Sequence, residues 1–121
     1  MTRYLITFSE ESITFPAEDL RDVVSDAAEV VAAAKEAGVW VLGAGLKGYD
    51  AMVVEPDGTL IPSYALLSAN VAGFTVVDVD TEEEAHEWAR RIAVACRAAQ
   101  EVRELLDGDA FGRTGAGDPD T

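Results

Sequence analysis

The sequence predicts a ferredoxin-like α+β sandwich, in which two helices cover one face of an antiparallel sheet. Two segments carry apolar residues at helical spacing, and short segments rich in β-branched and aromatic residues flank them. Their order is strand, helix, strand, a hairpin, strand, helix, strand. Because the crossovers of such a fold are right-handed, we expect both helices on the same side of the sheet.

The composition fits one folded domain with a hydrophobic core. Of the 121 residues, 49% are hydrophobic and 26% are charged, as in typical globular proteins. The formal net charge of −14 repels phosphate backbones and anionic lipids, so we expect neither nucleic acid nor a membrane as a partner. The N-terminal segment lacks the apolar run of a secretory signal, no stretch is long enough to span a bilayer, and the single cysteine cannot form an internal disulfide. A cytoplasmic protein is therefore expected.

The first strand and the first helix are predicted within residues 3–38. Apolar side chains alternate along residues 3–8, as in a strand. Pro16 suits a first helical turn, Lys35 lies near the negative end of the helix dipole, and Gly38 suits a C-terminal stop. The stripe expected to face the sheet consists of Leu20, Val23, Val24, Ala27, Val31 and Ala34.

The middle of the chain predicts a second strand, a hairpin and a long strand. Residues 39–42 form an apolar run, and residues 49–55 and 59–61 flank a Pro-Asp-Gly turn typical of hairpins. The hairpin should end at Pro62, because proline cannot donate to a sheet. Residues 73–80 give the clearest strand pattern, and no structure is predicted for the preceding connection.

The second helix is predicted to start after Thr81. Thr81 and Glu84 have the spacing of a capping box, in which the hydroxyl and the carboxylate satisfy free backbone amides. A last strand is expected over residues 100–106, which closes a domain of residues 1–107. Residues 108–121 form a polar, Gly-rich tail expected to be flexible or extended. The stripe of the second helix consists of Ala85, Trp88, Ala89, Ile92 and Cys96.

Three glycines, Gly43, Gly45 and Gly48, match the G-x-G-x-x-G pattern of dinucleotide-binding loops. Such a loop works because its third glycine opens a helix whose amides face the pyrophosphate. Here a strand and a hairpin turn follow instead. We therefore expect no dinucleotide and no other cofactor, and we interpret the glycines as a strand end and a flexible turn.

Several predicted strands carry apolar residues on both faces. Tyr4 stands beside Leu5, and Val76 beside Val77, so each face of the sheet receives apolar groups. Two helices can cover only one of these faces. We therefore predict a homodimer in which the uncovered faces of two sheets pack against each other.

The runs AGVWVLGAGL, GFTVVDVDTEEEAHEWARRI and EVREL resemble the YCII-related family, also called the DGPF domain family. The resemblance covers roughly residues 1–107 and implies a dimeric α/β barrel akin to muconolactone isomerase. The family's D-G-P-F segment falls on residues 61–64, which read Ile-Pro-Ser-Tyr, so its aspartate is absent. Some relatives are thought to use a His and Asp pair, but His86 lies on the second helix and matches no such position.

Candidate site residues are polar or aromatic groups near the glycine loop and the altered motif. The cluster of carboxylates at residues 78–84 is explained by a helix N-terminus, so no metal site is predicted. Cys96 is expected to act as a small hydrophobic residue and His86 as a solvated one. The ligand-binding candidates are Lys47, Tyr49, Ser63, Tyr64 and Asp78.

Two main functions remain open. The first is a non-catalytic dimeric module that binds a small molecule or a protein, because neutral residues replace the family's polar motif. The second is an isomerase or lyase that acts on a small organic acid or lactone, with Tyr64 or Asp78 transferring a proton. Some members of the family are associated with transcription factors. The resemblance therefore implies a third function, that of a regulatory protein acting beside a transcription factor. The fold alone cannot choose among them.

Overall fold

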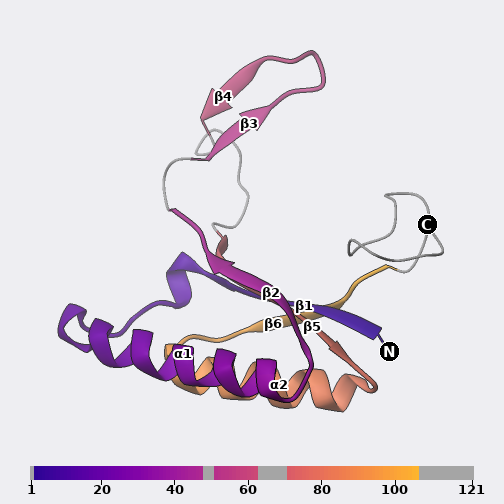
Figure 1. Ribbon diagram of the computed structural model, residues 1–121. Helices are drawn as coiled ribbons and strands as arrows, with labels where there is room; N and C mark the ends of the chain where they lie inside the picture. Colours follow the sequence, from indigo (N-terminus) through magenta and orange to yellow (C-terminus); the bar gives the residue numbers. More distant parts are fainter. Residues whose placement is uncertain (1, 48–50, 63–70, 107–121) are drawn as a thin grey trace.

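The computed structural model has the predicted ferredoxin-like architecture, with both helices on one face of a four-stranded antiparallel sheet (Figure 1). The strand order is β2-β5-β1-β6, and β3 and β4 form a separate two-stranded sheet. Neither of the described helices is long and apolar enough to cross a membrane. The structure describes residues 2–47, 51–62 and 71–106. The elements are β1 (Thr2–Ser9), the 3₁₀ turns η1 (Glu10–Ser12) and η2 (Ala17–Asp19), α1 (Leu20–Glu36), β2 (Trp40–Gly45), β3 (Met52–Val54), β4 (Leu60–Pro62), β5 (Val71–Val79), α2 (Glu82–Cys96) and β6 (Glu101–Glu104).

The register of β1 and β5 sends alternate side chains to opposite faces of the sheet. Tyr4 lies opposite Val77 and Ile6 opposite Thr75, and these residues face the helices. Ile6 and Val79 are completely buried there. The core is completed by Ala34, Ala85 and Ala89, whose small side chains let the helices approach the sheet.

The first helix begins later than its sequence pattern predicts. Pro16 precedes the 3₁₀ turn η2, and α1 starts at Leu20. Val23 is buried, as expected for the apolar stripe, but Leu20 and Val24 are exposed by 54% and 60%. The first turns of α1 extend beyond the ends of the strands, so no sheet lies beneath them (Figure 1). The prediction that Leu20 and Val24 face the core was therefore wrong.

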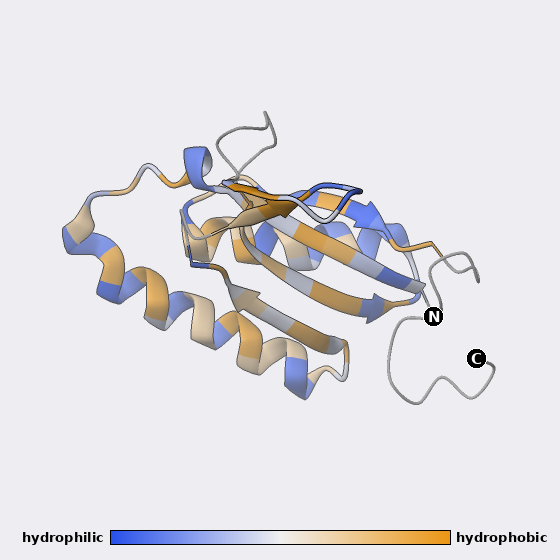
Figure 2. Ribbon diagram, turned by 90° about the horizontal axis from the view of Figure 1, so that it is seen from above, coloured by the Kyte–Doolittle hydropathy of each residue, from blue (hydrophilic) through white to orange (hydrophobic). Residues whose placement is uncertain are grey.

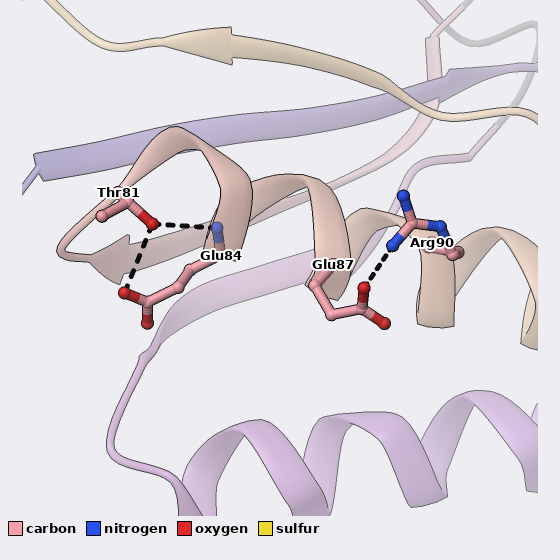
Figure 3. Close-up of polar contacts among 4 residues, drawn as sticks. All are labelled: Thr81, Glu84, Glu87 and Arg90. Atoms are coloured by element: carbon pink, nitrogen blue, oxygen red, sulfur yellow. Dashed lines mark hydrogen bonds and ion pairs between the residues drawn. The ribbon is translucent and has the colours of Figure 1, made fainter.

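The second helix has the cap that its sequence predicts. The hydroxyl of Thr81 accepts a hydrogen bond from the Glu84 backbone N–H at 3.1 Å and donates one to the Glu84 carboxylate at 3.4 Å (Figure 3). The carboxylate thus binds the capping hydroxyl rather than the backbone amide of Thr81. One turn further, Glu87 pairs with Arg90 on the exposed face (Figure 3). At the other end, Arg97 takes a left-handed conformation and stops the helix.

The second strand continues through two of the three motif glycines. Gly43 and Gly45 belong to β2, and neither has a positive φ. A Cβ added to Gly43 would lie 2.6 Å from Cη2 of Trp40 and 2.9 Å from the carbonyl oxygen of Phe74. Gly43 is thus required for close packing and not for a turn, which corrects the flexible-turn interpretation for these two positions. The third glycine lies outside the described residues.

The β3–β4 hairpin projects away from the sheet, on the side opposite the helices (Figure 1). Its turn is closed by the Asp57 carboxylate, which accepts a hydrogen bond from the Thr59 backbone N–H at 2.9 Å. Gly58 supplies the positive φ of +90° that this turn needs. Met52, Val54 and Leu60 leave more than half of their surface exposed, at 54%, 64% and 61%.

A candidate binding cavity between the sheet and the helices

A cavity of about 430 Å³ lies between the sheet and the two helices. This volume is within the range of small-molecule sites, about 300 to 1,000 Å³. Alanine and valine side chains of α1 form one wall, and α2 contributes a second. The larger and polar side chains that line the cavity include Phe8, Lys35, Trp40, Thr75, Trp88 and Cys96.

Two glycines of the sheet make room for the aromatic rings of the cavity. The ring of Trp40 lies over Gly43, as described above. In the same way, a Cβ on Gly73 would be 2.6 Å from Cε1 of Phe8. The strands therefore carry large flat side chains directly against bare backbone, which gives the cavity an aromatic lining.

Each tryptophan of the cavity also contacts a cation. The guanidinium carbon of Arg91 lies 4.4 Å from the centre of the Trp88 ring. The ammonium of Lys35 lies 5.9 Å from the centre of the Trp40 ring. Both distances fall within the range of cation–π attraction. These contacts help to hold the two indole rings in place.

The polar groups of the cavity are few and none is acidic. Within the described part of the chain, Lys35 is the only charged residue that lines it, and Lys35 makes no ion pair there. The hydroxyl of Thr75 and the thiol of Cys96 complete the set. Burial raises the pKa of the Cys96 thiol, while nearby Arg97 lowers it less. The thiol is therefore neutral at pH 7.

Neither of the two predicted site residues that the structure describes, Lys47 and Asp78, lies at this cavity. Lys47 follows β2 in an exposed position and does not line it. Asp78 points to the opposite face of the sheet, where it pairs with Arg3. The other three candidates, Tyr49, Ser63 and Tyr64, lie outside the described residues.

Sequence reasoning assigned the cavity residues to other roles. Trp88 and Cys96 fall on the apolar stripe of the second helix, Trp40 lies in the apolar run of residues 39–42, and Lys35 fits the negative end of a helix dipole. A usable signal was the size mismatch between the small side chains of α1, such as Ala27, and the two tryptophans, Trp40 on β2 and Trp88 on α2. A helix of small residues facing a few large rings does not fill the space evenly.

The remaining titratable residues of the described chain form no metal site. Among the residues with described positions, no group of three or more His, Cys, Asp and Glu side chains could hold a metal ion. His86 is about half exposed and lies 3.3 Å from the Glu82 carboxylate, one helical turn earlier. This pair belongs to the solvated face of α2, as the sequence predicts for His86.

Comparison with known proteins supports the fold and leaves the activity open. No family model matches the chain, and no curated protein matches it either. Among solved structures, the chain is similar to 5-chloro-2-hydroxyhydroquinone dehydrochlorinase (TftG) from Burkholderia phenoliruptrix, in its complex with 2,5-dihydroxybenzoquinone. The TM-score is 0.50 at 14% identity, and the alignment covers 88% of this chain and 95% of that one. At this identity the likeness concerns the fold alone.

Proposed function

We propose that the protein is a homodimeric module that binds a small, largely apolar molecule in the cavity between its sheet and its helices. The cavity itself is the observation that carries this proposal. It has the volume of a ligand site and an aromatic lining. A protein interior packed at the usual density would not contain a space of this volume.

Binding suits the cavity better than proton transfer does. The alternative, an isomerase or lyase, needs a general acid or base beside the bound molecule. Asp78, the described candidate for that role, lies on the other face of the sheet. The described lining holds no carboxylate or imidazole and its thiol is neutral, so Lys35 is the one lining side chain suited to exchange a proton there.

We also propose that the chain is a divergent relative of the YCII-related family, within the dimeric α/β barrels. The sequence runs quoted above support this, together with the ferredoxin-like fold and its likeness to TftG. That neighbour is in complex with 2,5-dihydroxybenzoquinone. Oxygenated six-membered rings are therefore a sensible class of ligands for a first screen.

The dimer is proposed from the open face of the sheet. Leu5, Val76 and Leu42 form one row across β1, β5 and β2 on the side away from the helices. Figure 2 views the sheet from this side and shows that its strands carry many hydrophobic residues, those of both faces included. Leu42 leaves 49% of its surface exposed. Val76 is only 8% exposed within one chain, so a second copy would cover mainly Leu42 and the exposed apolar hairpin above the row.

The binding proposal is tested by filling the cavity. Cys96→Phe places a ring in it, whereas Val94→Phe puts the same ring on the outer face of α2, where Val94 is 72% exposed. We expect ring compounds found by a thermal-shift screen to stabilise the wild type and Val94→Phe but not Cys96→Phe. Compounds that stabilise all three proteins equally would place binding elsewhere and contradict the proposal.

A further inference from the structure

We propose that the cavity selects ring compounds that carry one negative charge, with the ring against Trp40 and Trp88 and the anionic group at Lys35. A small aromatic carboxylate is the simplest such ligand. This inference rests on the proposed function, because it names the class of molecule that the cavity takes. Three features of the lining support it.

The first feature is the distribution of charge around α1. The chain carries 23 carboxylates against nine basic side chains, yet no carboxylate among the described residues lines the cavity. Asp26 and Glu29 of α1 border a different groove, between the outer sides of the two helices. The cavity is therefore a place in an acidic protein where an anion meets no carboxylate of a described lining residue.

The second feature is the position of Lys35. It lies in the last turn of α1 and its ammonium contacts the face of Trp40, while the described residues offer it no carboxylate partner. The interaction of a lysine with the helix dipole does not require its side chain to lie over an indole ring. Its flexible stem lets the ammonium remain near the ring and turn toward an anion that enters beside it.

The third feature is that the other polar groups tolerate an anion. Thr75 has a hydroxyl that donates no hydrogen bond within the described ranges, so it is available to a ligand oxygen. Cys96 keeps its proton, because burial raises the pKa of the thiol. Lys35 therefore gives the lining its positive charge, and no described lining residue carries a negative charge to cancel it.

The test uses a matched pair of probes, 4-tert-butylbenzoate and its neutral isostere 4-tert-butylbenzamide, on the full chain at pH 7. Both tryptophans of the protein line the cavity, so intrinsic fluorescence reports on this site, and titration calorimetry gives the Kd. The variants are Lys35→Met and Arg21→Met. Each removes one positive charge from α1, but Arg21 lies outside the cavity.

We expect the benzoate to bind the wild type about fivefold or more tightly than the amide, a ratio typical of one partly exposed ion pair. Lys35→Met should abolish this preference by weakening the benzoate alone, and Arg21→Met should retain it. Equal binding of both probes by the wild type would overturn the charge preference and leave the binding proposal standing. Failure of both probes to change the tryptophan signal, with no heat of binding, would overturn both proposals.

Discussion

Nε of Arg3 lies 3.6 Å from Oδ2 of Asp78, on adjacent strands and directly opposite each other. The second oxygen of this carboxylate, Oδ1, is buried and has no hydrogen-bond partner among the described residues. Arg3 is therefore the one described partner of a half-buried charge on the open face of the sheet. Removing Arg3 alone would therefore leave the Asp78 carboxylate without a cation, whereas removing both residues would leave no such charge.

Replacing Arg3 should cost more than replacing both members of the pair. Arg3→Leu leaves the Asp78 carboxylate without its cation, and we expect a loss of about 1–2 kcal/mol in the free energy of unfolding. The double variant Arg3→Leu with Asp78→Leu removes the stranded charge and should recover most of that loss. Urea unfolding of the two variants and the wild type measures this. A double variant as unstable as Arg3→Leu would contradict the account.

Leu42→Glu should break the proposed dimer. It places a charge in the apolar row that two copies would share, whereas Val94→Glu places the same charge on the exposed side of α2. Light scattering after size exclusion should give a dimer for the wild type and Val94→Glu, and a monomer near 12.9 kDa for Leu42→Glu. Each subunit carries a net charge of −14, so added salt should strengthen the dimer. A monomeric wild type at high salt would refute the dimer.

Gly43→Ala should destabilise the fold, whereas Gly45→Ala should have little effect. A Cβ at Gly43 meets the Trp40 ring at 2.6 Å and the Phe74 carbonyl at 2.9 Å, but a Cβ at Gly45 meets nothing within 4 Å. We expect a loss of about 1–3 kcal/mol for Gly43→Ala, as in other overpacked sites. A red-shifted tryptophan emission should accompany it, because the ring of Trp40 must move. Equal stabilities for the two variants would show that the packing at Gly43 is loose.

Stability should fall at alkaline pH through the ionisation of Tyr4. Burial raises the pKa of the Tyr4 phenol above its ordinary value of 10.0, and the neighbouring carboxylates Glu104, Glu82 and Glu83 raise it further. A raised pKa in the folded state means full stability below pH 10 and a progressive loss as the pH rises through the folded-state pKa. Tyr4→Phe removes this group, so its urea midpoint should decline less above pH 10. Parallel curves for the two proteins would rule out Tyr4 as the cause.

Local sequence features predicted most of the fold. The alternation along β1 and the long apolar run of β5 gave their strands, and the spacing of Thr81 and Glu84 gave the start of α2. These signals act within a few residues, so they can be interpreted without knowing what packs against them. The exposure of Leu20 was missed because a helix pattern does not reveal where the sheet beneath it ends.

The sequence by itself determined the kinds of elements, their order and the acidic composition of the chain. Only the tertiary structure decided that Lys35, Trp40, Trp88 and Cys96 share one cavity, and that Asp78 points away from it. The reason is physical: a cavity is the space left between side chains of distant segments, and its size depends on how closely a helix of small residues approaches the sheet. Periodicity assigns a residue to the covered face, but only the packed structure shows whether that face is filled.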